Sequence, residues 1–149
     1  MEYLIRDFQE TDIYLLVDLC AKHAAHETSK YNRDGKVSLL KSALLSHNPT
    51  LHCWIVMVED EMAGYATFTF DFSTWEVRHY LRLDCIYLEE KFRGLGIGTE
   101  MMKRLMKVAR ERDCVNLQWQ TPVFNETAIR FYERMGGKGL LKKRFFISI

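Results

Sequence analysis

The sequence lacks the features that mark several large classes of protein. Its basic and acidic residues nearly balance, and the formal net charge of +1 offers no strong positive field to a nucleic acid. No apolar run approaches the ~20 residues that cross a bilayer. Residues 1–7 lack a basic segment followed by an apolar one, which argues against a signal peptide. We therefore expect no nucleic-acid partner and no membrane association.

Cysteine and histidine are also sparse. Four cysteines are spread widely without a Cys-x-x-Cys pair, which favours buried, reduced thiols in a cytoplasmic protein over disulfides. The histidines form no His-Glu-x-x-His pattern. His23, His26 and Glu27 would lie close together on a helix, where a metal site and a polar helix end are both open interpretations. We expect the polar helix end, and no metal.

What the chain does have is a globular composition. Hydrophobic residues make up 48% of it and charges are scattered, which indicates a folded protein rather than a disordered one. Its 149 residues suit one domain, spanning 1–149. Periodicity and turn residues predict strands at 3–8, 52–58, 62–70, 80–88, 115–121 and 144–149, and helices at 12–25, 37–44, 96–112 and 125–135. This order predicts an α/β protein with a mixed sheet covered by helices.

A glycine-rich segment, Arg93-Gly94-Leu95-Gly96-Ile97-Gly98, lies between the strand at 80–88 and a helix. Such a loop brings bare backbone N–H groups and a helix N-terminus to one place, which suits a phosphate or pyrophosphate. A solvent-exposed turn is the plainer interpretation. The Walker pattern is absent, and the dinucleotide pattern fails because Thr99 stands where a glycine is needed. The pattern that remains is Arg-x-x-Gly-x-Gly, formed by Arg93, Gly96 and Gly98.

A second motif follows in the segment 125–136, Asn-Glu-Thr-Ala-Ile-Arg-Phe-Tyr-Glu-Arg-Met-Gly. Together the two motifs resemble the GNAT superfamily (the GCN5-related N-acetyltransferases), with its Gln/Arg-x-x-Gly-x-Gly/Ala loop and its later Asn-x-x-Ala-x-x-Phe-Tyr-x-x-x-Gly pattern. The resemblance is strong over residues 81–136 and weaker before them. The small polyamine and diamine acetyltransferases look most similar along this stretch.

The resemblance implies a GNAT fold, with a mostly antiparallel central sheet, flanking helices and strands that splay apart at the coenzyme A site. It implies direct transfer of an acetyl group from acetyl-coenzyme A to a primary amine of a small molecule, without a metal, in a protein that is often a homodimer. A peptide or protein N-acetyltransferase and a non-catalytic acyl-coenzyme A-binding module are the alternatives.

The resemblance also assigns the donor site. The loop N–H groups would hold the diphosphate, and a main-chain N–H of the strand before the loop would polarise the thioester carbonyl. Arg93 would contact phosphate, or else form a surface ion pair with Glu89 or Glu90. Asn125 would bond the pantetheine arm, cap its helix, or do both. The cofactor-binding candidates are Ile86, Tyr87, Leu88, Arg93, Gly94, Leu95, Gly96, Ile97, Gly98, Thr99, Asn125, Ala128 and Tyr132.

Two residues are candidates for proton transfer. Asp84 lies in the middle of a predicted strand, where aspartate is uncommon, and it stands with Cys85 where the polyamine enzymes have a glutamate and an aspartate. It is either the base, acting directly or through water, or a structural partner of Arg82 or the backbone. Tyr132 occupies the position of the family's general acid, and packing beside Phe131 is its alternative role.

The acceptor pocket is predicted from acidic and aromatic residues, which suit a cationic amine. For each residue taken alone, ordinary surface or core is the plainer interpretation. The candidates are Glu27, Tyr31, Asp71, Trp75, Tyr80, Asp84 and Trp119, with Gln118 and Gln120 beside the last.

Strict alternation along the strand predicted at 80–88 would place residues 82, 84, 86 and 88 on one face and residues 81, 83, 85 and 87 on the other.

Overall fold

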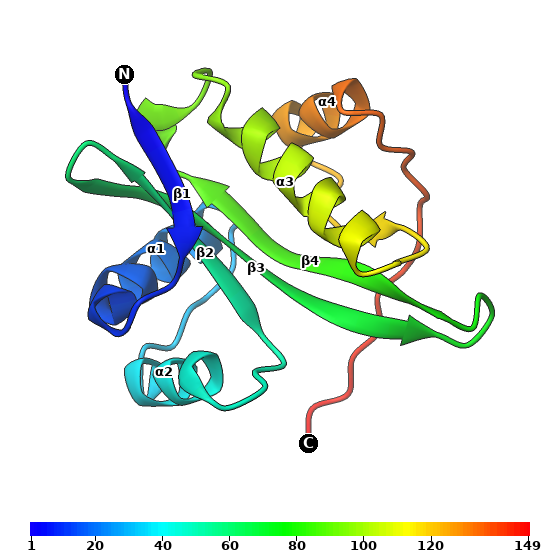
Figure 1. Cartoon of the computed structure of the whole chain (residues 1–149), viewed down its shortest axis with the longest axis horizontal. Coiled ribbons are helices and arrows are strands. Elements are labelled where there is room, and N and C mark those ends of the chain that lie inside the picture. Colours follow the sequence, from blue (N-terminus) through cyan, green and yellow to red (C-terminus); the bar gives the residue numbers. More distant parts are fainter.

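The computed structural model describes all residues, 1–149, and is built around a five-stranded sheet (Figure 1). The strand order is β1-β2-β3-β4-β5; the first four strands run antiparallel, and β5 runs parallel to β4. The strands are β1 (Tyr3–Asp7), β2 (His52–Val58), β3 (Glu61–Ser73), β4 (Arg78–Leu88) and β5 (Leu117–Gln118). The mostly antiparallel sheet implied by the resemblance is confirmed.

Helices cover both faces of this sheet. They are α1 (Ile13–His26), α2 (Lys36–Leu45), α3 (Ile97–Glu111) and α4 (Glu126–Arg134), with 3-10 turns η1 (Glu10–Asp12) and η2 (Glu90–Phe92). Figure 1 shows α1 and α2 together on one side, and α3 and α4 together on the other. None of the helices has both the length and the apolar character needed to span a membrane.

Two hydrophobic cores follow from this arrangement. The larger core packs the apolar stripe of α3, including Ile97, Met101 and Leu105, against the sheet. The stripe forms because these residues recur every four positions, which places them on one side of a helix. The smaller core lies between α1 and the opposite face of the sheet, around Leu16 and Tyr65.

A β-bulge in β4 overturns the predicted alternation. Leu83 pairs with Phe68 and Cys85 pairs with Thr67, so Asp84 is the extra residue without a partner on β3. A bulged residue shifts the strand by one position, and the side chains beyond it exchange faces. Residues 81, 83, 86 and 88 therefore all pack on the α3 side, whereas residues 85 and 87 pack on the α1 side.

Two predicted strands differ from the structure. The strand expected at 115–121 is reduced to Leu117–Gln118, and residues 144–149 form no strand. The C-terminal segment pairs with no strand, and β5 pairs with β4 alone, so neither is supported by hydrogen bonds along the outer edge of the sheet. Phe145, Phe146 and Ile147 are consequently exposed.

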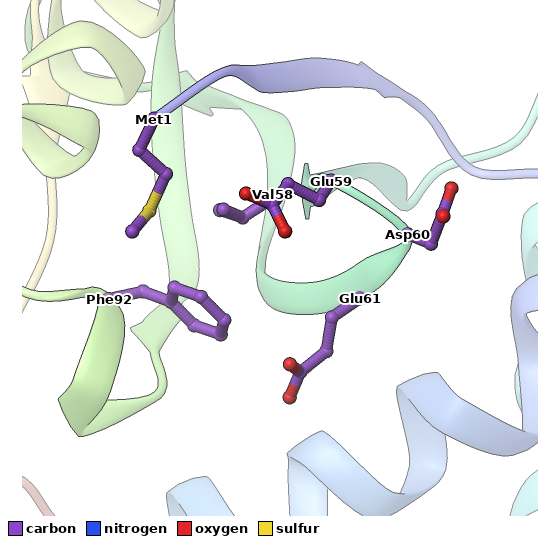
Figure 2. Close-up of a pocket in the computed structure, with 6 residues that line it drawn as sticks. All are labelled: Met1, Val58, Glu59, Asp60, Glu61 and Phe92. Carbon is purple, nitrogen blue, oxygen red and sulfur yellow. The ribbon is translucent and has the colours of Figure 1, made fainter.

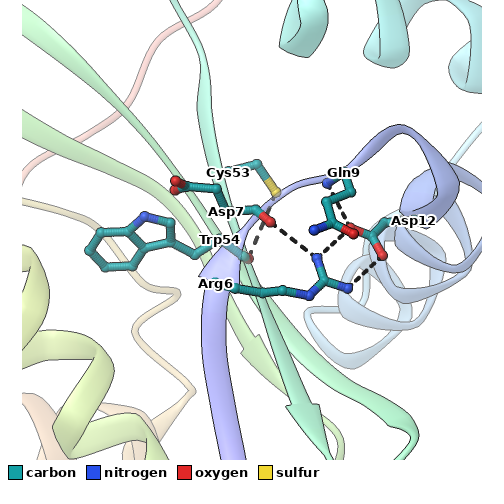
Figure 3. Close-up of polar contacts among 6 residues, drawn as sticks. All are labelled: Arg6, Asp7, Gln9, Asp12, Cys53 and Trp54. Atoms are coloured by element: carbon teal, nitrogen blue, oxygen red, sulfur yellow. Dashed lines mark hydrogen bonds and ion pairs between the residues drawn. The ribbon is translucent and has the colours of Figure 1, made fainter.

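Polar contacts tie the start of α1 to β1 (Figure 3). Arg6 donates hydrogen bonds to both carboxylate oxygens of Asp12, at 2.7 and 2.9 Å. The Asp12 carboxylate also accepts from the Gln9 backbone N–H at 2.7 Å. Asp12 is the last residue of the 3-10 turn that precedes α1, and at the N-cap position of this helix its side chain makes no capping hydrogen bond.

Candidate functional site

The glycine loop joins η2 to the N-terminus of α3. Gly94 and Gly96 have φ angles of 76° and 82°, a left-handed region that glycine enters without strain. No protein group accepts a hydrogen bond from the backbone N–H groups of residues 94–99. Free N–H groups on a loop and on the first turn of a helix make a site for an anion. The loop therefore has the geometry that was predicted for a phosphate or pyrophosphate site.

Gly98 has a different reason for being glycine. A Cβ atom there would lie 3.3 Å from Cζ of Phe131 and 3.9 Å from Cδ1 of Leu88. The missing side chain lets α3 approach α4 closely. The first motif thus touches the second one directly.

Arg93 folds back onto the end of β4. Its Nε donates to the Leu88 carbonyl at 2.9 Å, and its guanidinium carbon lies 5.6 Å from the centre of the Tyr87 ring. The ion pair with Glu89 or Glu90, offered as the alternative role, is not formed; Glu89 instead pairs with Lys22 at 2.6 Å. The arginine fixes the loop against the strand while its terminal nitrogens make no hydrogen bond in the protein.

Strands β4 and β5 separate near the loop. Their only pairs are Leu81 with Leu117 and Arg82 with Gln118. Beyond Arg82, the edge of β4 that faces β5 has no partner strand, and residues 86–88 lie in this unpaired part. The splayed strands implied by the resemblance are therefore present.

Asn125 is the N-cap of helix α4, and Tyr132 lies in its last turn. The Asn125 side chain accepts from the Ala128 N–H at 3.4 Å, so its capping role is confirmed. The ring of Tyr132 lies 5.2 Å from that of Trp119, edge to face. Burial, and secondarily the charge of Glu27, raises the pKa of Tyr132 to about 12. A phenol in this environment is neutral near pH 7 and retains a proton to donate.

A small pocket lies where β4 and β5 diverge. It has a volume of about 120 Å³ and is lined by Tyr80, Arg82, Leu83, Asp84, Gln118, Trp119 and Gln120. The structure thus gathers three predicted acceptor residues, Tyr80, Asp84 and Trp119. The Asp84 side chain is 51% exposed and lies 4.0 Å from the Arg82 guanidinium. Its carboxylate also accepts from the Cys85 thiol at 3.7 Å.

The other predicted acceptor residues lie outside this pocket. Trp75 is in the turn between β3 and β4 and is 96% exposed. Asp71 accepts a hydrogen bond from Thr69 within β3. Glu27 and Tyr31 are at and after the end of α1.

A larger cavity, of about 330 Å³, lies elsewhere (Figure 2). Glu59, Asp60 and Glu61 line it beside Met1, Val58 and Phe92. Three carboxylates repel an anion, so this cavity does not suit a diphosphate. Lys91 forms an ion pair with Glu61 at this cavity.

Sequence reasoning found only part of the environment of His23. Its Nδ1 lies 2.8 Å from the Tyr65 hydroxyl, and its Nε2 lies 3.4 Å from Oε1 of Glu27. The four-residue spacing of His23 and Glu27 was a usable signal, since such residues are neighbours on a helix. Nothing in the sequence indicated Tyr65. No group of three or more His, Cys, Asp or Glu side chains is placed to hold a metal ion.

Comparisons with known proteins agree with this geometry. The model of the acetyltransferase (GNAT) family matches residues 9–137. Thialysine N-epsilon-acetyltransferase of Sus scrofa is 28% identical, over 92% of this chain and 85% of that protein.

Two solved structures share the fold. Ribosomal-protein-alanine N-acetyltransferase from Brucella melitensis biovar Abortus 2308 has a TM-score of 0.79 and 19% identity, covering 99% of this chain and 100% of that one. AAC(6')-Iy, in complex with the bisubstrate analogue CoA-S-monomethyl-acetylneamine, has a TM-score of 0.81 and 14% identity. The match covers 100% of this chain and 99% of that chain. The chain belongs to the acetyltransferase (GNAT) family and is an acetyl-coenzyme A-dependent N-acetyltransferase.

Proposed function

We propose that the protein transfers the acetyl group of acetyl-coenzyme A to a primary amine of a small molecule that resembles a polyamine, a diamine or an amino acid. The observation that carries this proposal is the pocket at the splayed strands, where Asp84 lies with Tyr80 and Trp119. A carboxylate beside aromatic faces attracts an ammonium group. The similarity to thialysine N-epsilon-acetyltransferases supports an amine of this size.

The donor binds across the glycine loop and the unpaired edge of β4. The N–H groups of residues 94–99 hold the diphosphate, assisted by Arg93. A main-chain N–H within residues 86–88 polarises the thioester carbonyl and stabilises the oxyanion. Asn125 and Ala128, at the start of α4, flank the pantetheine arm. The free N–H groups and the divergence of β4 from β5 support this arrangement.

Transfer then requires movement of protons. Asp84 receives a proton from the acceptor ammonium, directly or through a water molecule, and leaves a neutral amine. The nitrogen lone pair attacks the thioester carbonyl carbon, the C–N bond forms and the C–S bond breaks. Tyr132 donates its proton to the departing thiolate. The half-buried position of Tyr132, which keeps it protonated, supports its role as the acid.

Peptide amines are the second candidate for the acceptor. The ribosomal-protein-alanine N-acetyltransferase and AAC(6')-Iy, which was solved with an acetylneamine analogue, both share this fold, so the fold alone does not select the acceptor. The shallow, half-exposed position of Asp84 is accessible to either kind of amine. The family match favours an enzyme over a non-catalytic acyl-coenzyme A-binding module.

Release of the coenzyme A thiol tests the proposal. The purified protein is incubated with acetyl-coenzyme A and, separately, with diamines, polyamines, lysine and thialysine, and a set of peptides with free α-amines. Thiol release with a small amine, together with an acetylated product of the expected mass, supports the proposal. Turnover of peptides alone selects the second candidate. Acetyl-coenzyme A binding without turnover of any amine contradicts an enzyme.

A further inference from the structure

The side chain of Arg93 is held at two points beside the glycine loop. Its Nε donates to the Leu88 carbonyl at 2.9 Å, and its guanidinium lies over the Tyr87 ring, 5.6 Å from the ring centre. An aromatic face attracts a guanidinium at this distance. Neither terminal nitrogen makes a hydrogen bond within the protein. The side chain is therefore ordered, while the donors that suit a phosphate stay free.

The ring of Tyr87 is itself fixed by other rings. It stacks on His23, with centroids 5.1 Å apart and planes 21° from parallel. The rings of His26 and Tyr65 lie 6.2 and 6.4 Å from it, and the side chain packs against the smaller core. A ring enclosed in this way has little room to change its orientation. Tyr87 therefore gives the guanidinium a fixed surface.

His23, which stacks on that ring, is held through both of its nitrogens. A hydrogen bond of 2.8 Å joins Nδ1 to the Tyr65 hydroxyl, and Nε2 lies 3.4 Å from Oε1 of Glu27. The histidine side chain is 13% exposed and Tyr65 is 2% exposed. A buried tyrosine on β3 and a carboxylate at the end of α1 thus set the plane of the imidazole. The imidazole in turn supports the Tyr87 ring.

The backbone at the end of β4 is also fixed. A Cβ atom on Gly64 would collide with the Tyr87 carbonyl oxygen, so β3 approaches β4 here as closely as only glycine allows. Directly after the strand, Glu89 pairs with Lys22 of α1 at 2.6 Å. The strand that carries the ring is therefore held by β3 on one side and by α1 through an ion pair.

We propose that Tyr87 and His23 are positioning residues, which hold the Arg93 guanidinium ready for the diphosphate of the donor. The inference rests on the proposed function, in which Arg93 assists the loop N–H groups. An arginine side chain has many rotamers, and it loses that freedom when it binds a phosphate. A guanidinium that is already held in place loses less on binding, so the donor binds more tightly. The two residues act on the donor through Arg93 and make no contact with it themselves.

Two donors that differ in the diphosphate test the proposal. Tyr87→Leu is expected to weaken acetyl-coenzyme A binding about 5-fold and His23→Leu about 3-fold, as measured by calorimetric titration. Tyr87→Phe keeps the ring and should recover most of the loss. Acetyl-pantetheine has the same thioester and arm but no diphosphate, so its kcat/KM should be the same in all these variants and the wild type. An equal fall with both donors overturns the proposal, because it would show a general disturbance of the strand.

A double variant provides a second test that needs no turnover. Arg93→Gln should weaken acetyl-coenzyme A binding about 10-fold, and Tyr87→Leu should add nothing to it, because the ring acts through the guanidinium. Arg112→Gln is the matched control, since it removes a similar contact, 4.5 Å from the Phe70 ring, at the far end of α3.

Losses that multiply in the double variant overturn the positioning role. Tighter binding in Tyr87→Leu also overturns it, because the ring would then hold Arg93 away from the donor. Lack of turnover of any amine by the wild-type protein contradicts the proposed function instead, and the calorimetric results still decide the inference.

Discussion

Gly98 and Phe131 meet at the contact between α3 and α4, where a Cβ atom on the glycine would lie 3.3 Å from the phenylalanine ring. Each residue belongs to one of the two motifs that identified the family. The contact fixes the start of α3, which carries the free N–H groups of the loop, against the helix that carries Tyr132. In the proposed mechanism, donor binding and proton donation therefore both depend on this packing contact.

Gly98→Ala is expected to overpack this contact. The added methyl group should destabilise the protein by about 1 kcal/mol, a fall in Tm of roughly 3 °C, and weaken acetyl-coenzyme A binding because the loop shifts. Phe131→Leu leaves room for the methyl group, so the double variant should lose less than the sum of the single losses. Thermal unfolding with and without acetyl-coenzyme A measures both effects. Additive losses would mean that the two residues do not contact each other.

Tyr132→Phe is expected to remove the proton donor while keeping the ring against Trp119. The kcat should fall by about 100-fold or more, and the KM for acetyl-coenzyme A should change little, because the phenol acts on the leaving thiolate. Steady-state thiol release at saturating amine measures this. Unchanged kcat would leave Tyr132 with a packing role alone.

Asp84→Asn is expected to weaken capture of the ammonium group and to slow its deprotonation. The ratio kcat/KM for the amine should fall by about 100-fold, whereas the affinity for acetyl-coenzyme A should stay constant. Asp60→Asn, in the exposed turn between β2 and β3, is the matched control because it lies away from the splayed strands. A loss of equal size in both variants would point to a general effect of charge rather than to the pocket.

The contact between Arg6 and Asp12 predicts a dependence of stability on pH. Burial alone would raise the pKa of Asp12, but the hydrogen bonds from Arg6 and from the Gln9 backbone outweigh it and hold the pKa below its usual value. A lowered pKa in the folded state stabilises the protein above the unfolded pKa of ~3.9, and this contribution is lost as the pH falls through the folded value.

Asp12→Asn should therefore cost about 2 kcal/mol at pH 7 and progressively less below pH ~3.9. Urea unfolding of both proteins across this range measures the difference. A difference that does not change with pH would show that the charge of Asp12 contributes nothing.

The C-terminal segment offers a test of the expected homodimer. Residues 140–149 expose apolar side chains, including Leu141, Phe145 and Phe146, and large exposed apolar surfaces are typical of contacts between chains. We expect a dimer in light scattering at micromolar concentration. Phe145→Asp combined with Phe146→Asp should favour the monomer. A monomeric wild-type protein would refute the expectation, and an equally stable dimer in the variant would place the interface elsewhere.

The sequence predicted the elements whose signals are local. The apolar stripe of α3 and the capping of α4 by Asn125 depend on residues within a few positions of one another, so their patterns are visible in one dimension. A terminal strand at 144–149 was also predicted, and this prediction was wrong. A strand forms only when a neighbour supplies hydrogen bonds, and the composition of the segment does not show whether it has one.

By itself, the sequence predicted the donor side of the site, because the spacing of Arg93, Gly96 and Gly98 is a local pattern that produces a loop with free backbone N–H groups. Tertiary structure decided the acceptor side. The bulge at Asp84 depends on how β4 pairs with β3, and it overturned the predicted alternation of side chains. The cluster of His23 and Tyr65 depends on the packing of α1 on the sheet, between residues that are 42 positions apart. Contacts of that kind arise from pairing and packing between distant segments, which no local pattern records.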